Sequence, residues 1–220
     1  GSISANSNLE LNNSVVDNTK DIIAYDTANM NNSTVNNKGK KVISNKEVNL
    51  DKSNVTNTGE ITSNEINMTN VTGYNNTGTI KGNHTTLTTT NDLNLTGTLH
   101  GEDYLEIKGN NVANNGGTTG TGYISITSND YTNNTELSAK TIVINASGNV
   151  VNNNMITAKD AEIKANSITN NDLIATEGYL GLIAQEQVIN TQGSAIYAGD
   201  NLVIKGAEVL NQRADILGQG

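Results

Sequence analysis

An asparagine recurs about every 19 residues along this chain of 220 residues, and that period constrains the fold more than any other feature. In each repeat an apolar or aromatic residue lies two positions before the asparagine. Leu95 stands where the column skips one step. The members of the column are Asn18, Asn37, Asn57, Asn76, Asn114, Asn133, Asn152, Asn170, Asn190 and Asn211. A short repeat kept over the whole chain indicates a solenoid in which each repeat forms one turn.

Two apolar columns keep step with the asparagines. The first opens each repeat and skips a step at Thr118; its members are Ile3, Ile22, Val42, Ile61, Ile80, Leu99, Leu137, Ile156, Ile174, Ile196 and Ile216. The second closes an apolar-x-apolar pair; its members are Leu11, Met30, Leu50, Met68, Leu87, Ile107, Ile126, Ile144, Ile163, Leu182 and Ile204. Each period therefore carries three short segments that alternate with period two, separated by Asn, Gly, Ser, Thr or Asp. This pattern predicts three short strands per repeat.

A single repeat cannot fold alone. Ordering 19 residues costs roughly 20–40 kcal/mol of backbone entropy, whereas each buried aliphatic side chain returns about 2 kcal/mol. Neighbouring repeats must supply the remainder, and crossovers between parallel strands are right-handed in ~98% of cases. We therefore predict an all-β fold, a right-handed parallel β-helix of about eleven coils of ~19 residues with three strands per coil. Residues 1–220 are expected to form one such segment, an internal fragment of a longer rod.

The asparagine column has two interpretations. Identical amides stacked one strand spacing apart can form a hydrogen-bonded ladder along the axis. Asparagine also tolerates left-handed turn geometry, so the column could consist of turn residues without a buried ladder. The ladder interpretation makes the ten asparagines the candidate structural site.

Composition excludes several classes of protein. The net charge is −9, from 13 basic and 22 acidic residues, so nucleic acid is a poor partner. No apolar run reaches the ~20 residues of a membrane-spanning helix, and we predict no membrane insertion. The chain has no Cys, which excludes disulfides and structural zinc sites of the cysteine type.

Candidate chemistry is sparse. Asp103, Asp160 and Asp200 recur near one coil position, but they precede strands and are typical of turn residues. His84 and His100 lie 16 residues apart, off the period, and are expected on the solvated surface. We predict no enzyme, no catalytic residues, no cofactor and no metal site.

Three other readings of the pattern are weaker. The pair at Gly116 lacks the Asp series of calcium-binding β-roll repeats, and the Gly-rich segment 114–122 is expected to be a flexible turn rather than a binding loop. Thr-x-Thr pairs are too few for an ice-binding face. The leucine-rich repeat has a different spacing around its asparagine.

One phrase of the repeat resembles a known family. It occurs as Gly199-Asp-Asn-Leu-Val-Ile-Lys-Gly-Ala-Glu-Val-Leu-Asn211, and again in residues 160–170 and 103–114. The order Gly-Asp-apolar-x-apolar, small residues and apolar-x-Asn resembles the filamentous haemagglutinin repeat of two-partner-secretion exoproteins. The resemblance covers nearly the whole chain. That family's secretion domain carries Asn-Pro signatures, and this chain has no Pro, so it would be a mid-rod segment.

The resemblance implies a function and partners. Such repeats form secreted, rod-like β-helices on Gram-negative cell surfaces, exported by an outer-membrane secretion transporter. They mediate or present cell adhesion to a receptor or glycan on a host or neighbouring cell. Two alternatives are an inert stalk of a contact-dependent inhibition toxin and a carbohydrate-active β-helix enzyme.

Overall fold

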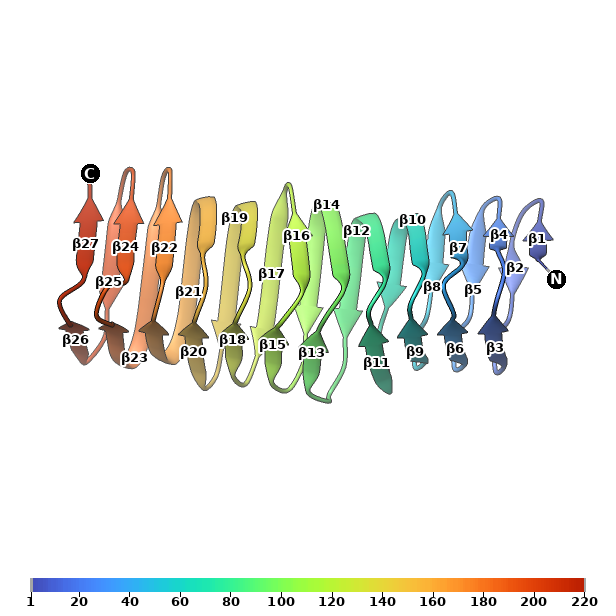
Figure 1. Ribbon diagram of the computed structural model, residues 1–220, viewed down its shortest axis with the longest axis horizontal. Helices are drawn as coiled ribbons and strands as arrows, with labels where there is room; N and C mark the ends of the chain where they lie inside the picture. The colour runs from blue at the N-terminus through green and yellow to red at the C-terminus, as the bar shows by residue number, and fades with distance from the viewer. Residues whose placement is uncertain (1, 220) are drawn as a thin grey trace.

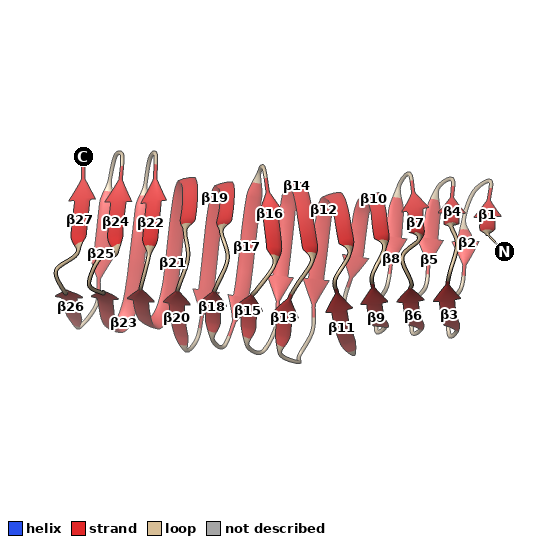
Figure 2. Ribbon diagram, viewed as in Figure 1, coloured by secondary structure: helices blue, strands red, loops and turns tan. Residues whose placement is uncertain are grey.

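The protein is a parallel β-solenoid of about eleven turns of ~19 residues. The structure, a computed structural model, describes residues 2–219 and contains no helix within that range (Figure 2). Successive coils lie side by side along the long axis, with the two ends of the chain at opposite ends of the rod (Figure 1). The predicted right-handed parallel β-helix fold is confirmed.

Strands account for most of the backbone. In chain order they are β1 (Ile3–Ala5), β2 (Leu9–Glu10), β3 (Val15–Asn18), β4 (Ile22–Ala24), β5 (Thr27–Asn29), β6 (Thr34–Asn37), β7 (Lys41–Ser44), β8 (Glu47–Asn49), β9 (Asn54–Asn57), β10 (Glu60–Met68), β11 (Gly73–Asn76), β12 (Thr79–Thr88), β13 (Leu93–Leu95), β14 (Thr98–Lys108), β15 (Val112–Asn114), β16 (Gly117–Gly120), β17 (Tyr123–Ser128), β18 (Tyr131–Asn133), β19 (Leu137–Ala146), β20 (Asn149–Asn152), β21 (Ile156–Asn170), β22 (Leu173–Thr176), β23 (Leu180–Asn190), β24 (Ala195–Ala198), β25 (Leu202–Lys205), β26 (Glu208–Asn211) and β27 (Asp215–Gly218).

The three columns of the sequence stack in register. Ile61 pairs with Ile80, and Ile80 with Leu99, so the first apolar column forms one line along the axis. Strands β3, β6, β9 and β11 form a separate 4-stranded sheet, whereas the other 23 strands belong to one continuous sheet. All the strand pairs described are parallel, because each coil repeats the path of the one before it.

The division of coils into strands differs from the prediction. Coils with three separate strands occur, as in β4, β5 and β6, but elsewhere neighbouring strands merge around a corner. In β21 a single 15-residue strand, Ile156–Asn170, runs through all three sides of its coil. The pairing of β21 skips Lys159 at one corner and shifts register between Ala165 and Ser167 at another, so the polar separators bend the strand without ending it.

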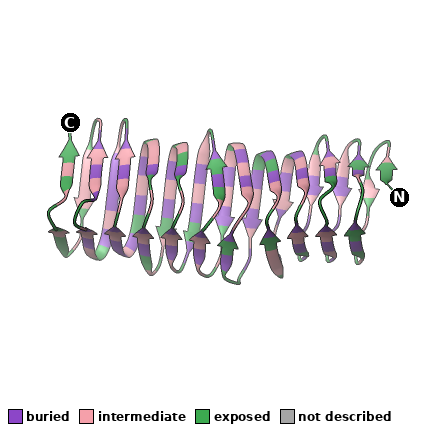
Figure 3. Cartoon of the chain, viewed as in Figure 1, coloured by how far each residue is buried: buried purple, intermediate pink, exposed green. Residues whose placement is uncertain are grey.

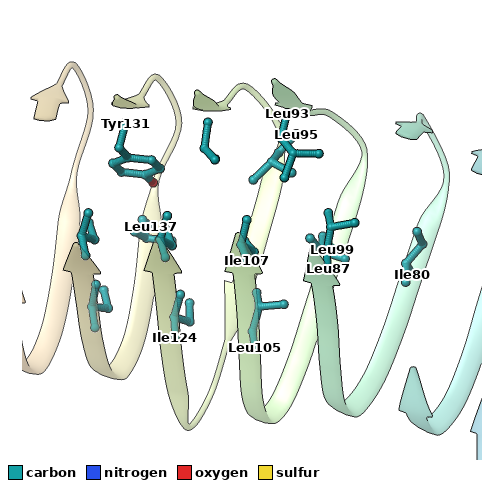
Figure 4. Close-up of a cluster of buried hydrophobic side chains, with 14 of the residues drawn as sticks. Ile80, Leu87, Leu93, Leu95, Leu99, Leu105, Ile107, Ile124, Tyr131 and Leu137 are labelled. Atoms are coloured by element: carbon teal, nitrogen blue, oxygen red, sulfur yellow. The ribbon is translucent and has the colours of Figure 1, made fainter. Parts of the chain in front are cut away.

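The core lies inside the coil and runs the length of the rod. Buried and more exposed residues alternate along the strands (Figure 3), as period-two patterning requires. Figure 4 shows side chains of neighbouring coils stacked upon each other, for example Leu105 and Ile124, which are register partners. Tyr131 is fully buried among these aliphatic side chains. Each such side chain contributes about 2 kcal/mol through burial.

The turns of the first coils share one backbone device. Asn13, Asn32, Lys52 and Asn70 each have φ between 51° and 56° and lie at equivalent places in successive coils. Asparagine adopts this left-handed region more readily than most residues, which explains three of the four. The Gly-rich segment 114–122 is not the flexible turn that was expected, since Gly117–Gly120 forms strand β16, paired with β14 and β19.

Candidate functional site

The asparagine column forms a hydrogen-bonded ladder in the interior. In its first run, Nδ2 of Asn18 donates to Oδ1 of Asn37 at 2.8 Å, Asn37 donates to Asn57 at 2.7 Å, and Asn57 donates to Asn76 at 2.8 Å. These four side chains are at most 5% exposed. Each amide donates toward the C-terminal coil, so the ladder has one polarity.

A second run of the ladder follows in the later coils. The Nδ2-to-Oδ1 distances are between 2.8 and 3.0 Å, and the members in order are Asn114, Asn133, Asn152, Asn170, Asn190 and Asn211. All except Asn211, which is exposed, are buried. The polarity is the same as in the first run.

The same amides also bind backbone carbonyl groups of the turn that follows them and of the next coil. Nδ2 of Asn57 contacts the carbonyl oxygens of Gly59 at 3.1 Å and Thr79 at 3.2 Å in addition to Asn76. Nδ2 of Asn170 likewise donates to the carbonyl of Asp172 at 2.8 Å. The ladder and the turn interpretations of the column are therefore not exclusive, because one side chain serves both.

The ladder is interrupted at Leu95. Before the gap, Nδ2 of Asn76 donates to the carbonyl oxygens of Thr96 and Thr98, at 3.2 and 3.0 Å. After the gap, Oδ1 of Asn114 is buried without a hydrogen-bond partner among residues 2–219. An unsatisfied buried acceptor of this kind costs about 1–3 kcal/mol.

Thr118 is a second buried polar residue without a partner. It takes the skipped step in the first apolar column, is 1% exposed, and its Oγ1 has no hydrogen bond within residues 2–219. Thr85 is equally buried, but its Oγ1 donates to the carbonyl of His100 at 2.8 Å. Buried threonines in this rod thus differ in whether their hydroxyl is satisfied.

An outer amide ladder runs beside the inner one, and the sequence analysis missed it. Asn134 donates to Asn115 at 2.7 Å, Asn153 to Asn134 at 2.8 Å, and Asn171 to Asn153 at 2.7 Å. These amides are exposed and donate toward the N-terminal coil, opposite to the inner ladder. The signal was present as repeated Asn-Asn doublets, in which the first residue faces the core and the second faces the solvent.

Aromatic side chains stack on one outer face. The rings of Tyr104 and Tyr123 are 5.6 Å apart between centroids and 6° from parallel, and His84 packs edge-on against Tyr104 at 6.4 Å. Burial, together with the nearby carboxylate of Glu106, raises the pKa of Tyr104. Within the core, burial raises the pKa of Tyr131 much further.

His100 belongs to a separate polar cluster. Its Nε2 lies 3.0 Å from Oε2 of Glu102 and its Nδ1 lies 2.8 Å from Oγ1 of Thr119. Hydrogen bonds from Thr121 and then from His100 lower the pKa of Glu102. The side chain of His100 is 16% exposed, so it lies on the outer surface but is partly covered by its neighbours.

The carboxylates do not converge on one point. Asp160 lies three coils along the same register column from Tyr104, the residue after Asp103. At ~4.8 Å per coil, Asp103 and Asp160 are therefore about 14 Å apart along the axis. A glycosidase pair needs less than about 10 Å. Oδ1 of Asp160 accepts a hydrogen bond from the backbone N–H of Tyr179 at 2.8 Å, which is a turn role.

The described residues 2–219 contain neither a metal-binding cluster nor a membrane-spanning helix. Within them, no group of three or more His, Cys, Asp or Glu side chains is placed to hold a metal ion. The same range contains no helix long and apolar enough to cross a membrane.

The chain matches no protein-family model, no curated protein and no solved structure. The geometry of the rod and the repeat phrase of its sequence are therefore the basis for a function.

Proposed function

We propose that this chain is a structural and adhesive rod segment of a secreted bacterial surface protein. The observation that carries the proposal is the stack of parallel coils with an amide ladder along its axis. Each coil contacts its neighbours, so adding repeats adds length without changing the cross-section. A structure of this kind places whatever it carries at a fixed distance from its attachment point.

The repeat phrase supports the placement on a bacterial surface. Leu105, Ala161 and Leu202 hold the same place in the phrase and lie in one register column. The phrase that resembles the filamentous haemagglutinin repeat is thus the coil unit of this rod. By that resemblance, an outer-membrane transporter exports the chain, and the absence of Cys suits a chain that is threaded unfolded.

An adhesive role requires contact through a solvent face. The outer faces differ from each other: one carries stacked Tyr and His rings, and another carries the exposed amide ladder. A receptor or glycan on another cell would bind one of the outer faces of the rod. The alternative function is the stalk of a contact-dependent inhibition toxin, which uses the same rod with no receptor contact; the short, even repeats favour a spacer of this kind.

Adhesion of coated particles tests the proposal. Beads carrying the segment are expected to adhere to target cells above beads carrying the heat-denatured segment. A bead that adheres no better than its denatured control would favour the inert stalk. Release of new chain ends from polysaccharides incubated with the segment would overturn both and favour a carbohydrate-active enzyme.

A further inference from the structure

A groove of about 700 Å³ lies on the outer surface of the later coils. Its floor crosses β19, β21, β22 and β24, so it runs along the rod axis over several coils. Short side chains form the floor, and Tyr197, Lys140, Lys159 and Glu177 line it as larger groups.

The groove exists because the side chains in one outward-facing register column are small over several successive coils. His100 and Tyr197 are the large side chains at the two ends of this stretch of the column. The positions between them, in register order, are Thr119, Ser138, Thr157 and Ala175. At the adjacent corner Ala139 and Ala158 are also small, and this widens the hollow.

Two lysines, Lys140 and Lys159, and one carboxylate, Glu177, line the groove, so its lining carries a net positive charge. Lys140 and Lys159 lie one above the other, since the residues before and after them pair in register. Neither makes a salt bridge within residues 2–219, whereas Lys38, Lys41 and Lys46 each have a carboxylate partner. Two ammonium groups one coil apart repel each other, and an anion placed between them relieves that repulsion.

The chemistry of the walls selects the kind of anion. The strands of the floor are already paired on both sides, as Thr157 and Ala158 of β21 are with β19 and β22, so they offer no edge to which an extended peptide could add. Hydroxyl groups of Ser138 and Thr157 and an aromatic side chain are suited to a hydroxyl-rich ligand with flat apolar faces. A pyranose sugar has both properties.

We propose that this groove binds a linear polysaccharide that carries carboxylate groups. Its sugars lie along the axis, with carboxylates near Lys140 and Lys159 and one ring packed against Tyr197. The inference rests on the proposed function, because it names the class of ligand that the adhesive rod contacts. It goes further by assigning the contact to this one groove.

Binding of polygalacturonate oligomers to the whole segment, followed by calorimetry, tests the proposal. The double variant Lys140→Gln/Lys159→Gln is expected to lose about tenfold in affinity. Its control is Lys20→Gln/Lys40→Gln, which removes the same charge at exposed lysines outside the groove and is expected to leave the affinity nearly unchanged. Equal losses of affinity in both variants would mean that polygalacturonate is attracted non-specifically by positive charge, and would overturn the proposal of a binding groove.

A second pair of variants tests the aromatic contact. Tyr197→Ala is expected to weaken binding several-fold, whereas Tyr25→Ala, at a tyrosine that is 64% exposed in an early coil, leaves it unchanged. Circular dichroism of each variant confirms that the rod is folded. No binding of polygalacturonate by the unmodified segment, or binding of neutral dextran of equal strength, overturns the proposal.

The outcomes separate this inference from the proposed function. Coated beads that adhere to cells without any binding of polygalacturonate leave the adhesive rod standing and overturn the groove. Binding of polygalacturonate by the groove without adhesion of the beads supports the groove and contradicts the adhesive role.

Discussion

The two runs of the inner ladder have the same geometry but meet the gap at Leu95 differently. The first run ends on Asn76, whose free donor finds two backbone carbonyls in the next turn. The second run begins on Asn114, whose acceptor finds nothing among residues 2–219. The difference follows from polarity: when every amide donates toward the C-terminal coil, a missing member leaves a donor before the gap and an acceptor after it.

Asn18 shows that the start of a run need not be unsatisfied. Its Oδ1 accepts a hydrogen bond from the backbone N–H of Lys20 at 3.2 Å. The equivalent residue two places after Asn114 is Gly116, whose N–H makes no such contact with Asn114. The backbone of the turn therefore decides whether an interruption of the ladder costs stability.

The largest effect is expected inside the second run. Asn133→Leu leaves both the donor of Asn114 and the acceptor of Asn152 without their ladder partners. We expect a loss of about 1–3 kcal/mol for each amide left unpaired, measured by chemical denaturation. Asn134→Leu, the same change at the exposed neighbour, serves as control and should cost much less. Equal losses would mean that the inner amides stabilise the rod no more than surface ones.

The edge of the gap should tolerate the same change better. Asn114→Leu removes one ladder bond, but it also removes the orphaned acceptor, and Oδ1 of Asn133 keeps a contact with the hydroxyl of Tyr131 at 3.3 Å. We expect less than half of the loss seen for Asn133→Leu, in the same denaturation series. A loss as large as that of Asn133→Leu would contradict the unequal roles of the two positions.

The two buried threonines extend this comparison beyond asparagine. Thr118→Val deletes a hydroxyl that has no partner and should raise stability by about 1 kcal/mol. Thr85→Val deletes a hydroxyl bonded to the carbonyl of His100 and should lower stability by about 1 kcal/mol. Thermal melting of both variants gives the signs. Changes of the same sign at the two sites would show that hydroxyl pairing does not control their stability.

The smallest effect concerns acid. Hydrogen bonds from Lys46 and then from Ser7 lower the pKa of Asp26 below its ordinary 3.8. Because the pKa of Asp26 is lower in the folded state than in the unfolded state, the ion pair stabilises the fold at pH values above the unfolded-state pKa. This stability is lost as the pH falls through the folded-state pKa. The melting temperature should therefore fall as the pH is lowered below about 4, and Asp26→Asn should make this fall smaller.

Asp200→Asn is the matched control for that titration. Asp200 makes no salt bridge within residues 2–219, so its replacement should leave the acid-induced drop as it is in the unmodified chain. If Asp26→Asn leaves the acid-induced fall in melting temperature unchanged, this ion pair does not contribute to stability in acid.

The period of the sequence was sufficient to predict the coil and its three columns. Ile61, Ile80 and Leu99 recur with the period because the side chains that face the core must stack on each other. Positions in such a stack must be apolar, and this is visible in the sequence. The inner ladder was foreseen for the same reason. Its polarity was not, because the direction in which Asn57 donates depends on where the carbonyl oxygens of the turn lie.

Features of the outer surface were harder to predict. The edge-on packing of His84 against Tyr104 needs a one-residue shift of register between Gly82 and His84, which the period alone does not reveal. The groove was also missed, since it is defined by small residues between Thr119 and Tyr197 and not by any motif. Interior columns are constrained by packing, whereas surface columns are constrained by what the rod touches.

Contacts between the side-chain amide protons of the ladder test the central claim most directly. In a nuclear Overhauser spectrum, the account predicts that cross-peaks link Asn114 to Asn133 and Asn133 to Asn152, and that none links Asn76 to Asn114 across Leu95. Side-chain amides that exchange freely with water and show no such links would contradict it.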